Sequence, residues 1–256
     1  METTIEEVMG IPVVMEVTAG ASSAAAVGKA FRWLRHVDAT FSTYDPDSEV
    51  SRLNRGELAV EDASAALRRV LDRCELLKHA TDGYFDVRAP LEGAIDPSGY
   101  VKGWAVQLAG ELLRRSGVES WFVNAGGDIF MQGGRDGQES WRVGVQHPRQ
   151  RMDVAAVLSL SGGGVATSGA YERGAHVVNP HTGAPPSGVL SVTIAGPDLG
   201  VADAYATAAF AMGVAGAEWA AALRDYGAIV IFDDDTIAYS ANVERHLLDS
   251  SMGVGA

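Results

Sequence analysis

The chain has 256 residues, enough for one large domain or for two small ones that share a core, and no low-complexity linker or internal repeat divides it. Its hydrophobic fraction of 47% and charged fraction of 21% are ordinary for a globular protein. The net charge of −13 argues against a nucleic-acid partner, because phosphate backbones bind stripes of lysine and arginine and the sequence has none. We therefore expect a single domain over residues 1–256.

The one cysteine, Cys74, excludes an internal disulfide and a thiolate zinc site. Residues 1–7 lack the basic start of a signal peptide, and no apolar run approaches membrane-spanning length. The sequence therefore predicts a cytoplasmic protein with no signal or lipoprotein sequence and no membrane segment.

The first half of the chain is predicted to be mainly helical. A strand at 11–17 comes first, and the polar, turn-rich stretch 42–54 is predicted to be a loop. Elsewhere apolar residues recur at spacings of three and four, which predicts three helices. These helices cover 22–36, 63–79 and 103–115.

The second half is rich in β-branched and alternating segments, which predict strands. These strands cover 120–124, 141–146, 154–160, 189–195 and 228–232. Two helices are expected at 201–212 and 217–226. Helices and strands do not alternate regularly, and this favours an α+β fold over a doubly wound parallel sheet.

Five polar segments carry groups that could bind a ligand, and each also has a plain structural explanation as a turn, a cap or a connector. They cover residues 41–54, 81–86, 96–105 together with 124–128, 166–183 and 201–207. In the first segment Tyr44 could stack on a flat ring while hydroxyls bind the ligand. In the third, a loop of small residues enters a helix, and the free N–H groups of a helix N-terminus suit phosphate.

The last two segments carry candidate catalytic groups. Asp203 and Thr207 lie four residues apart, so on a helix they share a face. A carboxylate and a hydroxyl are hard oxygen ligands suited to Mg²⁺, although capping of the helix by Asp203 is an alternative. The near-neutral pKa of a histidine would suit His176 to acid or base work, and Arg173 could bind phosphate; a structural role is the alternative for His176.

Taken in order, these segments resemble the signatures of the ApbE family, the FAD:protein FMN transferases. The resemblance extends from about residue 9 to residue 213, most of the chain. The matching stretches are S-x-Y-x-x-x-S-x-x-S-x-x-N at 42–54, G-x-F-D at 83–86, D-x-x-x-x-x-K-G at 96–103, N-x-G-G-D at 124–128, T-S-G at 167–169, H-x-x-[DN]-P-x-x-G at 176–183 and D-x-x-x-T at 203–207.

This resemblance implies the family's compact α+β domain, related to the T-fold, with an antiparallel sheet and packed helices. It implies that FAD contacts Met9, Tyr44, Tyr84, Phe85, Asp86, Asp96, Lys102 and Val177. It implies magnesium on the carbonyl of Gly99 and the side chains of Asp203 and Thr207, with His176 and the metal-bound Asp203 as catalytic residues. Three positions depart from the family pattern: Asn179 and Gln107 replace common aspartates, and Ala206 replaces a common serine.

The implied activity is Mg²⁺-dependent transfer of FMN from FAD to a threonine or serine hydroxyl of an acceptor flavoprotein, with release of AMP. The family's acceptors carry a motif like D-x-x-[ST]-G-A-[ST]. A Mg²⁺-dependent FAD pyrophosphatase, in which water replaces the hydroxyl, would use the same residues. A protein that binds FAD without turnover is a further alternative, although it would not need both Asp203 and Thr207.

Overall fold

The computed structural model describes residues 1–89, 93–150, 152–169 and 177–248. In chain order its elements are β1 (Glu2–Val8), β2 (Ile11–Val17), α1 (Ser23–Phe41), α2 (Glu49–Asn54), the 3-10 helix η1 (Val60–Asp62), α3 (Ala65–Ala80), α4 (Ser98–Arg115), β3 (Trp121–Ala125), β4 (Asp128–Gln132), β5 (Trp141–Gln146), β6 (Val154–Leu160), β7 (Gly162–Gly169), β8 (Val189–Gly196), α5 (Leu199–Ala211), α6 (Ala215–Ala221), β9 (Gly227–Phe232), β10 (Ile237–Tyr239) and α7 (Ala241–Glu244).

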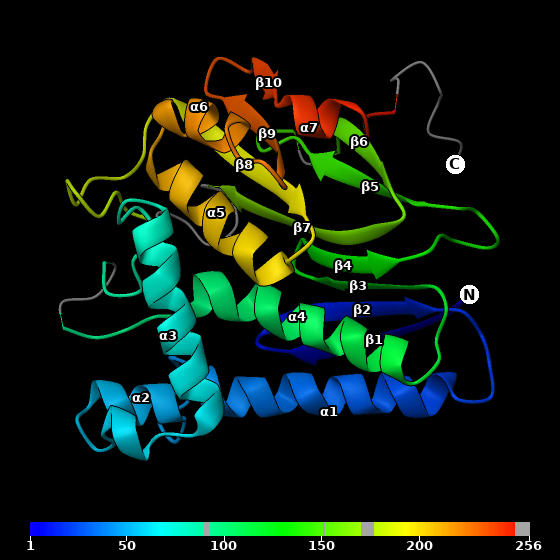
Figure 1. The fold of residues 1–256 in the computed structure, drawn as a ribbon, viewed down its shortest axis with the longest axis horizontal. Helices are drawn as coiled ribbons and strands as arrows, with labels where there is room; N and C mark the ends of the chain where they lie inside the picture. The colour runs from blue at the N-terminus through cyan, green and yellow to red at the C-terminus, as the bar shows by residue number, and fades with distance from the viewer. Residues whose placement is uncertain (90–92, 151, 170–176, 249–256) are drawn as a thin grey trace.

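Eight strands form one antiparallel sheet in the order β1-β2-β3-β4-β7-β8-β9-β10. The remaining two, β5 and β6, pair only with each other among the named strands and form a separate hairpin (Figure 1). Helices and an antiparallel sheet in one chain confirm the predicted α+β class.

The two faces of the central strands belong to different cores, as the two-residue period of a strand requires. In β7, Ala166 packs in the core under the helices, whereas its neighbour Val165 packs in the core under the β5–β6 hairpin. Ala228 and Ile229 of β9 divide in the same way. The helices α1, α4 and α5 lie side by side over one face, and β5–β6 covers part of the other (Figure 1).

Helices α4 and α5 approach closely because a glycine lies at the crossing. A Cβ added to Gly103 of α4 would lie 2.6 Å from the carbonyl oxygen of Leu199 and 3.0 Å from the Cβ of Asp203, both in α5. No larger residue fits there without moving a backbone. This contact brings the first turns of both helices together.

Most predicted elements are confirmed, and the differences have local causes. The stretch 42–54 is not all loop: its second half forms α2, because the Ser48 side chain caps the helix by accepting from the N–H of Ser51. Helix α4 begins at Ser98, five residues earlier than predicted, so the small residues before Gly103 are helical. The prediction missed β1, β4, β7 and β10, of which β7 has four glycines among its eight residues and few large apolar ones.

Within the residues that the structure describes, no helix is both long enough and apolar enough to span a membrane.

Candidate functional site

A cavity of about 470 Å³ opens where α1, α4, α5 and the end of β7 meet; we call it the main cavity. The predicted FAD and metal residues that the structure describes all line it. They are Met9, Tyr44, Tyr84, Phe85, Asp86, Asp96, Gly99, Lys102, Val177, Asp203 and Thr207. The predicted catalytic residue His176 and the candidate phosphate ligand Arg173 lie outside the described residues.

Near the inner end of the main cavity Lys102 pairs with the buried Asp128, and the buried carboxyl group of Asp203 is close to both. The Nζ of Lys102 lies 3.2 Å from Oδ2 of Asp128, which is completely buried. Neither oxygen of Asp128 accepts a hydrogen bond of good geometry among the described residues, so the charge of Lys102 is its main compensation. Asp203 is 3% exposed, and its Oδ2 accepts from the N–H of Gly103 (3.1 Å).

Both carboxyl groups are shifted towards their neutral forms. Burial raises the pKa of Asp128, and the nearby Lys102 ammonium only partly opposes this. Burial also raises the pKa of Asp203 well above its ordinary value, and the negative charge of Asp128 adds to the effect. Two carboxylates that share one lysine leave a deficit of positive charge, which a bound cation would correct.

The hydroxyl of Thr207, one turn after Asp203, meets a second hydroxyl from β7. The Oγ1 of Thr207, one turn further along α5, lies 3.2 Å from Oγ of Ser168 at the end of β7. It would also lie 3.2 Å from a Cβ placed on Gly99, so α4 passes close to this hydroxyl. The N–H of Gly103, which in a regular helix points to the carbonyl of Gly99, donates to Oδ2 of Asp203. A carbonyl oxygen has two lone pairs, so that of Gly99 keeps acceptor capacity.

The capping explanation for Asp203 is wrong. Helix α5 is capped by Asp198, whose side chain accepts from the N–H of Val201. Its first residue, Leu199, also donates its N–H to Oε1 of Gln107 (2.7 Å), the position where the family often has an aspartate. Asp203 is therefore free of a capping role and lies in the second turn, facing α4.

The serines of the 42–54 stretch bond to the stretch itself. Oγ of Ser48 and Oγ of Ser51 both donate to the carbonyl of Ser42, at 2.5 and 3.2 Å. Asn54 makes two hydrogen bonds to the backbone of Ile95, next to the predicted ligand Asp96. Tyr44 is different, because its side chain is 88% exposed at the rim of the main cavity. The regular spacing of this stretch therefore shapes a loop that presents one aromatic ring.

A second aromatic group stands opposite, in the turn after α3. Buried Thr81 accepts from the N–H of Phe85 (3.0 Å) and fixes the turn, which passes through positive φ at Asp82 and Gly83. The ring of Tyr84 packs edge-on against His181, with centroids 4.5 Å apart. His181 also bonds to the carbonyl of Asp82 (3.0 Å), so this ring is held in place.

Sequence reasoning missed the roles of Asp128 and His181. The stretch 124–128 was interpreted as a tight turn or as part of a family signature, with no role given to the Asp128 carboxylate. The turn is present: Gly126 and Gly127 both have positive φ between β3 and β4. The signal was available, since a carboxylate that starts a buried strand needs a partner. His181 gave no signal, because its contacts cross almost a hundred positions of the chain.

The chain was compared with known proteins. The family model described as "ApbE family" matches residues 9–91 and 87–231. Curated relatives named FAD:protein FMN transferase include one from Treponema pallidum, 32% identical over 213 residues (72% of this chain, 58% of the relative). Another, from Salmonella typhimurium, is 30% identical over 129 residues, 46% of this chain. The matched segment spans 37% of the Salmonella relative's length.

Solved structures show the same fold. The flavin transferase ApbE from Vibrio cholerae superposes with a TM-score of 0.85 at 24% identity, covering 96% of this chain and 99% of that one. The apbe protein from Thermotoga maritima gives a TM-score of 0.84, also at 24% identity, covering 97% and 99%. The family match covers most of the sequence, and the folds agree over nearly the whole of both chains. The chain belongs to the ApbE family.

Proposed function

We propose that this chain is a Mg²⁺-dependent FAD:protein FMN transferase whose domain extends over residues 1–256. The observation that carries the proposal is the main cavity, where residues far apart in the sequence meet: aromatic rings, including the exposed Tyr44, on one side, and the buried Asp203 with the Thr207 hydroxyl and the Lys102 ammonium on the other. Such a cavity would bind a ligand that has an aromatic ring system at one end and a pyrophosphate at the other. The relatives' names agree with this assignment.

FAD would lie along the main cavity with its flavin at the outer end. Tyr44 is exposed there and presents a free face for stacking, and Tyr84 offers a second ring that is held by His181. The pyrophosphate would lie over the first turn of α4, where backbone N–H groups and the Lys102 ammonium favour anions. Met9, Phe85, Asp86, Asp96 and Val177 would complete the contacts along the cavity.

The residues present fit a magnesium ion. The Asp203 carboxylate, the Thr207 hydroxyl and the Gly99 carbonyl are hard oxygen donors that lie close together. Burial raises the pKa of Asp203, and a bound cation would favour its charged form. Among the described residues no group of three or more acidic, histidine or cysteine side chains is placed to hold a metal. Few protein ligands are usual for Mg²⁺, which takes its other oxygens from substrate phosphates and water. When bound, the ion would neutralise charge on the pyrophosphate.

The reaction is a phosphoryl transfer. The oxygen of an acceptor hydroxyl forms a bond to the FMN-side phosphorus, the bond from that phosphorus to the AMP oxygen breaks, and AMP leaves. The hydroxyl proton passes to a base, and His176 is proposed for this role because of its place in the family signature. Lys102 would hold the phosphates while Asp128 keeps its ammonium in position.

The acceptor is proposed to be a flavoprotein that carries a D-x-x-[ST]-G-A-[ST]-like motif. The test is the intact mass of a small carrier protein with this motif after incubation with the enzyme, FAD and Mg²⁺. A gain of one FMN that survives denaturation, with equimolar AMP in solution, is the expected result. Transfer would be contradicted if the enzyme consumed FAD many times over and the mass of the carrier protein stayed unchanged.

A FAD pyrophosphatase is the second candidate, because nothing in the buried cluster distinguishes water from a protein hydroxyl as the attacking group. It predicts free FMN and AMP with the acceptor unchanged in mass. A protein that only binds FAD predicts neither product. The same incubation therefore separates the three activities.

A further inference from the structure

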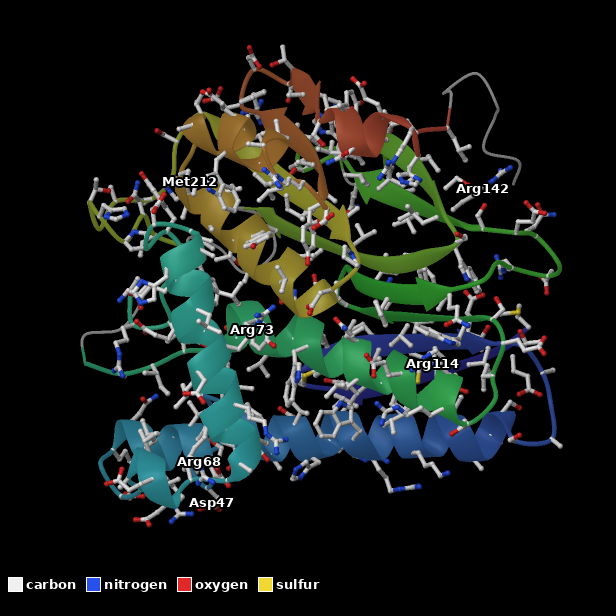
Figure 2. All side chains as sticks on the ribbon, viewed as in Figure 1. Asp47, Arg68, Arg73, Arg114, Arg142 and Met212 are labelled. Atoms are coloured by element: carbon white, nitrogen blue, oxygen red, sulfur yellow. The ribbon has the colours of Figure 1, made fainter. Side chains whose placement is uncertain are left out.

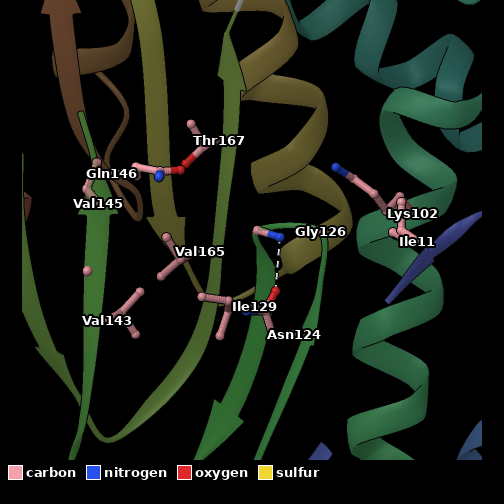
Figure 3. A pocket seen from close by; sticks show the side chains of 12 residues that line it. Ile11, Lys102, Asn124, Gly126, Ile129, Val143, Val145, Gln146, Val165 and Thr167 are labelled. Atoms are coloured by element: carbon pink, nitrogen blue, oxygen red, sulfur yellow. Dashed lines mark hydrogen bonds between the residues drawn. The ribbon is translucent and has the colours of Figure 1, made fainter. Parts of the chain in front are cut away.

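A second cavity, of about 370 Å³, adjoins the main cavity. Figure 3 shows the residues that line the second cavity. The two cavities share Ile11, Lys102 and Thr167 as lining residues. Figure 3 shows Lys102 extending from α4 on one side and Thr167 lying across the cavity on β7. A molecule in the second cavity would therefore reach the group proposed to hold the pyrophosphate without passing the flavin end.

One wall of the second cavity is the edge of a strand. Four consecutive residues of β5, from Val143 to Gln146, line it. Side chains alternate between the two faces of a strand, so a cavity that touches four in a row reaches the strand along its backbone edge. Among the described residues β5 pairs only with β6, whereas the outer edge of β6 is covered by bonds to His246 and Leu248. Among the described residues, the edge of β5 at Val143–Val145 thus offers backbone donors and acceptors for another strand.

The other walls suit a chain of small residues. Apolar side chains, including Ile129 and Val165, form the lining beside β5. Three glycines, Gly126, Gly127 and Gly144, contribute backbone without side chains. Asn124 braces the glycine turn by accepting from the N–H of Gly127 at 3.0 Å (Figure 3). Among the described lining residues Lys102 is the one charged group, and no aromatic ring is present, so nothing here recognises a second flavin or nucleotide.

We propose that the second cavity is the docking groove for the acceptor protein, whose hydroxyl-bearing segment binds as an extended strand along the edge of β5. This inference rests on the proposed transfer to a protein hydroxyl and names how that substrate is recognised. Strand addition takes its affinity from backbone hydrogen bonds, which suits a motif of small residues with few side-chain handles. The glycine turn lets the segment approach closely enough to direct its hydroxyl towards the Lys102 end of the main cavity.

Gly144 provides the blocking variant. An added Cβ there has its nearest contact at 3.5 Å, with Val154, and the residue does not have positive φ, so a side chain is tolerated. Gly144→Phe should lower kcat/KM for the carrier protein at least about tenfold, while the dissociation constant for FAD stays within about twofold. Arg142→Phe is the matched control: Arg142 (labelled in Figure 2) is exposed on the same face of β5, two residues away, and does not line the groove. Equal transfer by both variants would overturn the proposal.

Disulfide trapping tests the groove without relying on turnover. A Gly144→Cys enzyme should crosslink to a carrier with a cysteine next to the acceptor hydroxyl, and Arg142→Cys should crosslink at least about tenfold less. The native Cys74 is buried and does not compete. A crosslink without any FMN transfer would refute the transferase and leave the groove in place. Transfer with no selective crosslink would refute the groove, as would crosslinking of two enzyme copies at position 144 in place of the carrier.

Discussion

At the buried end of the main cavity, polar groups are held by the fold itself: Asp128 and Asp203 are 0% and 3% exposed, and the Lys102 side chain is 19% exposed. At the open end, Tyr44 is 88% exposed and touches little of the protein. The first arrangement is preorganised, because packing fixes the groups before a substrate arrives. At the open end, Tyr44 would make most of its contacts only after the ligand binds. Changes at the buried end should therefore affect turnover and stability strongly, and changes at the open end should affect FAD affinity weakly.

The strongest test of this contrast is Asp203→Asn. It removes one charge with little change of shape, and we expect turnover to fall by about a thousandfold or more, because the carboxylate acts mainly on charge that develops during transfer. The dissociation constant for FAD should rise by less than about tenfold. Asp198→Asn is the matched control, since it changes an aspartate of the same helix whose capping bond an asparagine can replace. Full activity of Asp203→Asn at limiting Mg²⁺ would refute the metal assignment.

The next largest effect is expected on stability from Lys102→Met. The substitution leaves Asp128 buried beside no cation, which should lower the free energy of unfolding by about 3–5 kcal/mol in urea titrations. Adding Asp128→Asn to this variant should restore part of the loss.

Lys78→Met is the control for that effect. It breaks the Lys78–Asp86 pair of 2.7 Å, whose lysine side chain is 37% exposed, so it should cost no more than about 1 kcal/mol. Equal losses for the two lysines would show that the inner pair is no more preorganised than one near the surface.

Gly103→Ala tests whether the approach of α4 to α5 positions the buried groups. The new Cβ would meet the Leu199 carbonyl at 2.6 Å, and the required shift should cost about 1–3 kcal/mol and reduce turnover. Gly28→Ala in α1 is the matched control, because a Cβ there has only an ordinary 3.5 Å contact with Arg32 and should stabilise the helix. A Gly103→Ala enzyme with unchanged melting temperature and turnover would contradict the close-packing argument.

The smallest effect is expected at the open end. Tyr44→Ala should raise the dissociation constant for FAD about 2- to 10-fold, the range for loss of one aromatic stacking contact, and leave the melting temperature unchanged. Tyr44→Phe should keep the wild-type affinity. Quenching of FAD fluorescence measures the dissociation constant of both variants. An unchanged constant for Tyr44→Ala would show that the ring does not stack on FAD.

Local spacing made much of the candidate site predictable. Asp203 and Thr207 share a helix face because they are four residues apart, and that relation needs no tertiary contact. The 42–54 stretch matches a family signature, and its hydroxyls were interpreted either as ligand-binding groups or as parts of an ordinary loop. In the structure the hydroxyls of Ser48 and Ser51 bond within the loop. Hydroxyl spacing alone does not distinguish these outcomes, because ligand and backbone present the same kind of acceptor.

The sequence by itself determined the α+β class and most helices and strands, because these depend on periodicity and short-range order. Its motifs, through their resemblance to the ApbE family, also named residues that line the main cavity. The tertiary structure alone decided that Lys102 pairs with Asp128 and that α4 lies against Asp203 at a glycine. It alone placed β5 beside the same lysine, with β6 as the strand paired with Val143–Val145 among the described residues. Such relations join residues dozens of positions apart, and they depend on which strands pair and how closely helices pack, which no local pattern encodes.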